Sequence, residues 1–303
     1  MEQSDNIAFY NRYSQNIDYE KIYGKKAIEF VYENKIGQML LPIVTSSTVS
    51  KVYGHLQNTK YSAKKVPEFI KSYNIQINEF EKGSNRLKPI EESYINFNEF
   101  FIRKYKKGLR SFPEVSDELG APAEGRYFGY SKVDANTKIP VKGKFLSVQN
   151  LLLDERFFEP FIDGPLVISR LCPVDYHRYH YPDDGSTVDS YTIPGELHSV
   201  NPMALSFKED IFIKNERRVS ILETKNFGTM AYIEVGATCV GKIVQSHDED
   251  IEFIRGQEKG YFLFGGSTVI ILGEKGRWAP SSDILNNTQN GIETYIRLGD
   301  KIN

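Results

Sequence analysis

Apolar residues in the first third of the chain recur at the spacing of an amphipathic helix. They are Ile28, Val31, Tyr32, Ile36, Met39 and Leu40. Steps of three and four residues bring such side chains to one face of a helix. Pro42 is expected to end this helix, because proline lacks the backbone donor and clashes with the preceding turn. Farther along, Asn96 and Glu99 have the spacing of a capping pair, which predicts a helix carrying Phe100 and Phe101.

From about residue 120 the pattern changes to short apolar or alternating runs that are separated by Gly, Pro and Asp. Such runs are typical of β-strands. The clearest are residues 166–168, 231–235, 261–264 and 293–297. The two styles together predict an α+β fold, with a helical N-terminal region at residues 1–105 and a β-rich domain at residues 106–303.

Composition and charge narrow the class of protein. The chain has 303 residues, of which 40% are hydrophobic, and a net charge of -2, which suits a globular protein and argues against a nucleic-acid binder. The first five residues are polar and acidic, unlike a signal peptide, and no run approaches the roughly 20 apolar residues that span a bilayer. We therefore expect an intracellular protein whose membrane contact, if any, is peripheral.

The two cysteines, Cys172 and Cys239, lie in apolar stretches and are expected to be buried free thiols rather than a disulfide. The chain has no Cys-x-x-Cys motif, which excludes a zinc ribbon.

The run Gly265-Gly266-Ser267-Thr268 lies between two strand-like segments. A glycine pair there is typical of a turn, but glycine also permits backbone conformations that bring a serine onto its own preceding carbonyl. Ser267 Oγ could then attack the Gly266 carbonyl and convert the amide to an ester. Elimination across the serine would split the chain and leave a pyruvoyl group at position 267. Taken alone, these residues are more typical of an ordinary hairpin, in which Gly-Ser-Thr is common.

Two histidines occur three residues apart, His177 and His180, in a segment bounded by prolines. Histidine suits a catalytic base because its pKa lies near neutrality. A purely structural role in hydrogen bonding is one alternative. A metal site built from these histidines with Asp183 and Asp184 is another, but no further ligand cluster supports it and Asp183-Asp184-Gly185 is typical of a plain turn. We therefore expect no metal.

Several blocks, taken in order, resemble the phosphatidylserine decarboxylase family of pyruvoyl enzymes, in the subgroup with Gly-Gly-Ser-Thr. The resemblance is carried by residues 97–103, 121–126, 170–185, 195–202, 215–218, 234–241 and 260–272. It covers the chain from about residue 95 to about residue 272 and extends more loosely to both ends. The Asp-Tyr-His-x-x-His and Gly-Ser-Thr blocks are its most specific parts.

The resemblance implies a proenzyme that cleaves itself between Gly266 and Ser267. The products would be a large chain of residues 1–266 and a small chain of residues 267–303 that begins with a pyruvoyl group, the only cofactor implied. This group would decarboxylate phosphatidylserine to phosphatidylethanolamine and CO2. The resemblance also implies a homodimer, peripheral on the cytoplasmic face of the cell membrane.

The resemblance further assigns roles to four residues. His180 would activate Ser267 in a self-cleavage triad, and His177 would act in the decarboxylation step. The aspartate that the family has as the third member is replaced here by Glu124, which we expect to accept a hydrogen bond from Nδ1 of His180. Its extra methylene displaces the carboxylate by about 1.5 Å, one C–C bond. Glu124 could therefore slow or block cleavage, or be a mere exposed turn residue.

A lipid substrate requires access to a membrane. The apolar helical face, with residues 39–44, could supply it, and a basic run could face anionic headgroups. The basic residues are Arg103, Lys104, Lys106, Lys107 and Arg110. Core packing and a solvated helix end are the alternative interpretation. Two other functions stay open at this point: a pyruvoyl decarboxylase of a soluble amino acid, and an uncleaved membrane-associated protein without enzymatic activity.

Overall fold

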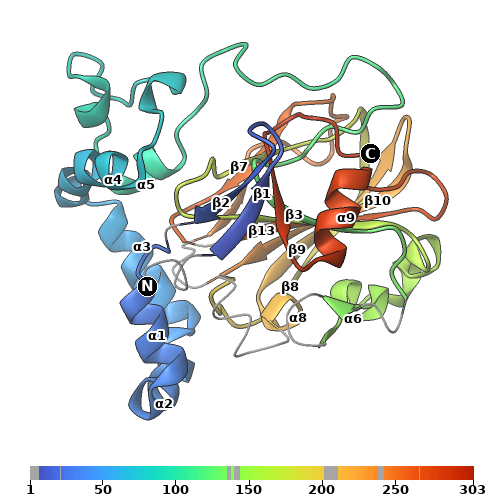
Figure 1. Ribbon diagram of the computed structural model, residues 1–303, viewed down its shortest axis with the longest axis horizontal. Coiled ribbons are helices and arrows are strands. Elements are labelled where there is room, and N and C mark those ends of the chain that lie inside the picture. The colour runs from blue at the N-terminus through green and yellow to red at the C-terminus, as the bar shows by residue number, and fades with distance from the viewer. Residues whose placement is uncertain are drawn as a thin grey trace.

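A nine-stranded sheet forms the centre of the molecule in the computed structural model (Figure 1). The structure describes residues 7–20, 22–134, 138–139, 144–200, 211–237, 242–265 and 267–303. The strand order is β2-β1-β14-β3-β6-β13-β10-β9-β8. The bounds are β1 Ile7–Asn11, β2 Asn16–Glu20, β3 Gly125–Tyr130, β6 Leu166–Leu171, β8 Gly185–Ile193, β9 Arg217–Thr224, β10 Gly228–Gly236, β13 Ser267–Gly273 and β14 Glu293–Ile296. Strands β1 and β14 run parallel, and the other neighbouring pairs are antiparallel.

A smaller three-stranded sheet packs against this one. It has the order β11-β12-β7, with bounds β11 Ile243–Gln245, β12 Glu258–Phe262 and β7 Arg178–His180. A buried ion pair joins the two sheets, with Lys259 Nζ 2.7 Å from Glu234 Oε1. A third, two-stranded sheet consists of β4 Lys138–Ile139 and β5 Lys144–Phe145.

The N-terminal helices lie beside the sheets rather than between them (Figure 1). They are α1 Lys25–Glu33, α2 Lys35–Val44, α3 Ser47–Gln57, α4 Val66–Tyr73 and α5 Phe97–Phe101. Later helices are α6 Val148–Leu152, α8 Ile211–Lys214 and α9 Ser282–Gln289, and α9 packs on β3 and β14. Short 3-10 helices are η2 Lys60–Lys65, η3 Ile77–Glu79, η4 Ile90–Glu92, η5 Glu155–Phe157 and η6 Glu159–Phe161. In the part of the chain that the structure describes, no helix is both long and apolar enough to cross a membrane.

The apolar residues from Ile28 to Leu40, predicted to lie on one helix, are divided between the two helices α1 and α2. Asn34 interrupts this stretch with extended backbone and caps α2, accepting the Ile36 N–H at 2.9 Å. The expectation that the helix ends at Pro42 is wrong, because α2 continues to Val44. The capping pair is confirmed, since Asn96 Oδ1 accepts the Glu99 N–H at 2.8 Å at the start of α5.

The strand predictions for residues 166–168 and 231–235 are confirmed by β6 and β10. The run 261–264 overlaps only the last two residues of β12, which ends at Phe262, and the run 293–297 contains β14 and extends one residue past its end at Ile296. Strands β1 and β2 occur where the pattern predicted helices, and they join the sheet through the parallel pairing of β1 with β14. The mixed α+β class is confirmed.

Two apolar clusters form the core. The larger one fills the space around the sheets with residues such as Val167, Ile233 and Ile270. The second, which we call the aromatic cluster, contains Phe69, Phe97, Phe100, Phe101 and Phe264 together with other residues of the N-terminal helices. Because Phe264 lies just before Ser267, the aromatic cluster brings the N-terminal helices against the segment that precedes β13.

Candidate active site

Ser267 is the first residue of β13, a strand at the interior of the large sheet. It is fully buried and pairs with Leu171 of β6 and Gly236 of β10. Gly265, two residues earlier, has a φ of 149°, a conformation open essentially to glycine alone. Gly266, the other half of the expected cleavage site, lies outside the described residues. The serine hydroxyl is thus held by the sheet next to a turn that requires glycine.

His177 is the histidine that contacts Ser267. Its Nδ1 lies 3.1 Å from Ser267 Oγ, and its Nε2 lies 2.9 Å from the carbonyl oxygen of Cys172. A carbonyl can only accept, so Nε2 carries the proton and Nδ1 presents its lone pair to the serine hydroxyl. Burial, with the nearby charge of Arg103, holds the pKa of His177 well below its usual value. The ring is therefore a neutral proton acceptor for Ser267.

The neighbours of His177 come largely from α5 and the residues after it. The Phe101 ring stacks on the imidazole at 3.8 Å between centroids. The buried Arg103 guanidinium donates to the carbonyls of Val174 at 2.7 Å and Asp175 at 3.0 Å. These contacts hold both the ring and the loop from which it projects.

A buried ionic cluster lies behind the carbonyl that His177 binds. Asp175 accepts the backbone N–H of Cys172 at 2.7 Å and also pairs with Arg126. Arg126 and Arg170 share Glu20, and Arg170 also binds Glu293 at 2.6 Å. Sequence reasoning missed this cluster, although charged residues inside apolar strand runs are a signal for it.

The expectation of a buried free thiol is confirmed for Cys172, which donates to Glu20 Oε2 at 2.8 Å. Burial raises the pKa of this thiol well above its usual value. Cys239 lies outside the described residues.

His180 makes different contacts from those expected. Its Nδ1 lies 2.8 Å from the Gly256 carbonyl oxygen and its Nε2 lies 3.3 Å from the Tyr176 hydroxyl, so the hydrogen bond expected with Ser267 is not formed. The reason is geometric: along extended backbone, residues three apart point to opposite sides. One of the two histidines can therefore face Ser267, and in this structure it is His177.

Glu124 is buried, not an exposed turn residue, and it is not hydrogen-bonded to His180. Its carboxylate accepts hydrogen bonds from the Tyr105 hydroxyl at 2.8 Å, Arg110 Nε at 2.7 Å, the Tyr295 hydroxyl at 2.7 Å and the Leu298 N–H at 3.2 Å. Burial alone raises the pKa of Glu124, but Arg110 and the tyrosines hold it below its usual value. Glu124 is therefore ionised, and its carboxylate accepts hydrogen bonds from four surrounding groups.

Two tyrosine rings lie between Glu124 and His180. The Tyr105 ring, whose hydroxyl binds Glu124, packs on the Tyr176 ring with centroids 4.6 Å apart. The Tyr176 hydroxyl in turn contacts His180. The two residues expected to touch are thus connected through a packed tyrosine pair.

The acidic residues beside the histidines bind cations of the protein. Asp183 Oδ1 lies 2.6 Å from Arg255 Nη2 and 2.8 Å from Asn226 Nδ2. Asp184 Oδ1 accepts the backbone N–H of Arg255 at 2.9 Å, and Asp184 Oδ2 lies 3.5 Å from Lys225 Nζ. Within the described ranges, no group of three or more His, Cys, Asp or Glu side chains is placed to hold a metal ion.

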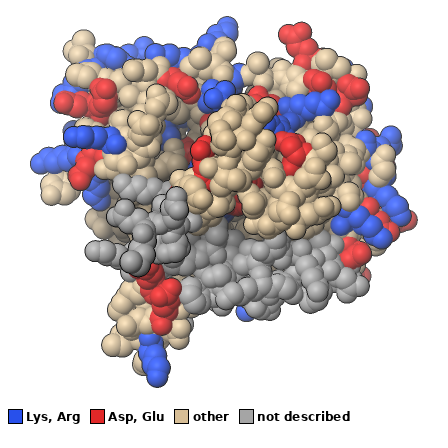
Figure 2. Space-filling model, in the orientation of Figure 1, with Lys and Arg blue, Asp and Glu red and all other residues tan. Residues whose placement is uncertain are grey.

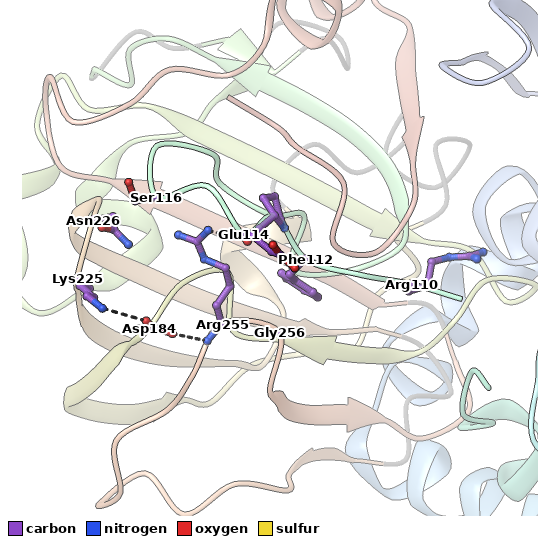
Figure 3. A pocket seen from close by; sticks show the side chains of 10 residues that line it. Arg110, Phe112, Glu114, Ser116, Asp184, Lys225, Asn226, Arg255 and Gly256 are labelled. Atoms are coloured by element: carbon purple, nitrogen blue, oxygen red, sulfur yellow. Dashed lines mark hydrogen bonds and ion pairs between the residues drawn. The ribbon is translucent and has the colours of Figure 1, made fainter. Parts of the chain in front are cut away.

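Figure 3 shows a surface pocket of about 600 Å³. Its lining includes Arg110, Phe112, Asp184, Arg255 and Gly256. The Gly256 carbonyl binds His180 and Arg110 binds Glu124, so the pocket borders these two residues. Ser267 is not part of its lining.

Comparisons with known proteins show the family of this chain. The family model described as phosphatidylserine decarboxylase matches residues 97–303. A protein of Clostridium tetani named phosphatidylserine decarboxylase proenzyme is 40% identical over 98% of this chain and 97% of its own length. A protein of Clostridium novyi with the same name is 39% identical over 98% of both chains. The chain therefore belongs to the phosphatidylserine decarboxylase family.

Proposed function

We propose that this chain is a phosphatidylserine decarboxylase proenzyme that cleaves itself between Gly266 and Ser267. Membership of the family supports the activity and the substrate. The observation that carries the cleavage site is the contact between Ser267 Oγ and the unprotonated Nδ1 of His177, at 3.1 Å. A buried serine with a neutral imidazole as its acceptor is the arrangement that activates a serine nucleophile.

Cleavage then proceeds in three steps. His177 takes the hydroxyl proton, Ser267 Oγ bonds to the carbonyl carbon of residue 266, and the C–N bond to residue 267 breaks, which leaves an ester and a free amine. Loss of the Cα proton of residue 267 breaks its Cβ–Oγ bond and releases residue 266 as a carboxylate. Water then replaces the nitrogen of the dehydrated residue, and ammonia leaves. Residue 267 becomes the pyruvoyl terminus of the small chain.

The residues around Ser267 fit a pyruvoyl site. The group would supply a carbonyl that takes up the electron pair left on the substrate carbon when CO2 departs. His177 stays next to position 267 because Phe101 and the Cys172 carbonyl hold its ring. The same imidazole is thus placed to accept the serine proton before cleavage and to deliver a proton to the substrate carbon afterwards. This role in decarboxylation is the one that the family resemblance assigns to His177.

His180 and Glu124 belong to this proposal as positioning residues. Each holds one side of the Tyr105–Tyr176 pair, which lies beside the loop that carries His177. They act on cleavage through that loop rather than by contact with Ser267. A direct triad role would require Nε2 of His180 to exchange its contact with the Tyr176 hydroxyl for one with Ser267, and Nδ1 to exchange the Gly256 carbonyl for Glu124.

A membrane-facing role for the N-terminal helices is supported by exposed apolar side chains on α2 and α3. Exposed fractions are 63% for Ile36, 80% for Met39, 59% for Ile43 and 59% for Val52. Single exposed apolar residues are common, but a group of this kind on neighbouring helices is typical of an interaction surface. We place this surface against the cytoplasmic face of the membrane, where the lipid substrate lies.

The basic run adds less to this surface than the sequence suggested. Arg103 is buried, and Arg110 is mostly buried against Glu124. Lys104 lies 3.7 Å from Glu258. On the face visible in Figure 2, basic and acidic side chains are interspersed, in keeping with the small net charge. The apolar residues of α2 and α3 therefore carry the membrane proposal. We also propose that the protein is a homodimer, as the family resemblance implies.

Intact-mass measurement and denaturing electrophoresis test the function. The purified protein should consist of residues 1–266 and a small chain beginning with a pyruvoyl group at position 267. It should release CO2 from phosphatidylserine in detergent micelles and not from free serine or an aromatic amino acid. Activity on a free amino acid instead would favour the soluble-substrate alternative. A protein that stays full-length and still decarboxylates the lipid would overturn the proposal.

A further inference from the structure

Asn98 lies in α5 and binds the segment that leads to the cleavage site. Its side chain is buried, and its Oδ1 accepts the backbone N–H of Phe264 at 2.9 Å. Phe264 stands two residues before Gly266. The side-chain amide is thus bonded to the backbone close to the bond that is to be broken.

The other end of the same amide is fixed to α3. Nδ2 donates to the Gly54 carbonyl at 3.2 Å and to Asn58 Oδ1 at 2.9 Å. A backbone N–H can only donate, so the atom facing Phe264 is the oxygen and the orientation of the amide is defined by its partners. Asn98 therefore connects the third N-terminal helix to the segment before Ser267.

Aromatic packing reinforces this link. The Phe264 ring lies 5.1 Å from Phe97 and 4.9 Å from Phe101, the residues on α5 that flank Asn98. It also lies 5.8 Å from Tyr53 of α3. Phe101 stacks on His177 as well. One short helix thus contacts both the proton acceptor and the segment that carries the carbonyl to be attacked.

We propose that Asn98 is a positioning residue for self-cleavage, which fixes the backbone at Phe264 and so restricts how the chain approaches the bond that Ser267 attacks. The inference rests on the proposed cleavage at Gly266–Ser267. Attack requires a defined approach, and a displacement of about 1 Å can cost ~100-fold in rate. Glycine, as at Gly265, admits many backbone conformations, so a hydrogen bond at the preceding residue, Phe264, restricts that choice.

Two variants of nearly equal shape isolate this hydrogen bond. Asn98→Leu removes the acceptor for the Phe264 N–H and also the donors to α3. Asn98→Asp removes the same donors but keeps an oxygen that can accept from Phe264. Asn98→Leu should slow self-cleavage by about 10- to 100-fold, and Asn98→Asp should cleave faster than Asn98→Leu. The measurement is a time course of chain splitting, starting from protein isolated soon after synthesis.

Ser62→Ala is the matched control. Ser62 Oγ accepts the backbone N–H of Phe97 at 2.9 Å and donates to the Gln57 carbonyl, so its loss also loosens α5 but leaves the bond to Phe264 intact. Ser62→Ala should lower the melting temperature and leave the cleavage rate close to that of the wild type. If Asn98→Leu gives no soluble protein, Asn98→Ala takes its place in the comparison.

Hydroxylamine distinguishes attack by Ser267, which forms the ester, from the later elimination that splits the chain, because it cleaves an ester and not an amide. If Asn98 acts on the attack by Ser267, the slow variant should contain little ester, and hydroxylamine should release few fragments. A wild type that stays uncut defeats the proposed function itself. A wild type that is cut, together with an Asn98→Leu protein that cleaves at the same rate or a Ser62→Ala protein that is equally slow, overturns the role of Asn98.

Discussion

At the scale of single residues, the site depends on which nitrogen of one histidine carries the proton. The Cys172 carbonyl fixes the proton on Nε2 of His177, and burial keeps the ring neutral. His180 has its Nδ1 on a carbonyl instead and faces Tyr176. Two chemically identical side chains thus differ in what they can do because of their hydrogen-bond partners.

The two histidines should respond differently to substitution. His177→Ala should slow self-cleavage by about 100- to 10,000-fold, the usual contribution of a general base. His180→Ala should cause a smaller loss, because it acts through Tyr176. The family resemblance implies the opposite ranking, so time courses of chain splitting for the two variants separate the accounts. A His180→Ala protein that stays uncut while His177→Ala cleaves normally would return the base to His180.

Glu124 should matter for stability more than its place in a turn motif suggests. Glu124→Gln removes the buried charged partner of Arg110 and leaves it paired with Glu79, whose side chain is 40% exposed. Breaking a buried pair costs about 3 kcal/mol or more. Glu124→Asp keeps the charge, but its shorter side chain cannot reach all four donors, so it should also unfold at a lower temperature. Thermal unfolding of the three uncut Ser267→Ala proteins measures this without interference from cleavage.

The matching cleavage time courses, in proteins that keep Ser267, decide between a structural and a catalytic role. Loss of cleavage in Glu124→Gln without any change in melting temperature would contradict the structural role. That result would favour the triad role implied by the family.

At the scale of elements, α2 and α5 perform different tasks. Helix α5 is buried and contacts the site, whereas α2 presents apolar side chains outward. Substitutions on α2 should therefore change membrane binding and leave processing intact.

Met39→Glu tests this separation. The change should weaken binding to phosphatidylserine-containing vesicles by about 10-fold, because one apolar contact worth roughly 1.5 kcal/mol is lost. Cleavage should continue at the wild-type rate. Leu87→Glu is the matched control, since Leu87 is 99% exposed but lies outside α2 and α3. Sedimentation with vesicles measures both. Equal weakening by the two variants would place the membrane surface elsewhere.

At the scale of the whole molecule, the predicted small chain is built into the interior of the sheet. Strand β13 lies between β6 and β10, and β14 lies between β1 and β3. Side chains of the predicted small chain also bind buried polar residues of the predicted large chain: Glu293 binds Arg170, and Tyr295 binds Glu124. Cleavage at residue 266 would cut the backbone and leave these contacts in place.

The two chains should therefore stay together after cleavage. On size-exclusion chromatography the cleaved protein should elute as one species at the volume of the uncut Ser267→Ala variant. The small chain should separate only in denaturant, since its ladder hydrogen bonds and apolar contacts are lost on unfolding. A small chain that elutes alone in native buffer would contradict this account.

Local patterns were enough to predict the α+β class, the cap at Asn96 and the strands β6 and β10, because each depends on neighbours a few residues away. Motif resemblance was enough for the family. Strands β1 and β2 were missed, since β1 is held by a parallel partner almost three hundred residues away along the chain.

Only the tertiary structure could decide that His177 contacts Ser267 and that Glu124 binds Arg110 and Tyr295. Both histidines and the glutamate have the right chemistry in the sequence, but hydrogen bonds act over about 3 Å. Which groups come that close depends on how β7, β13 and β14 are placed by the sheets, and no local pattern contains that information.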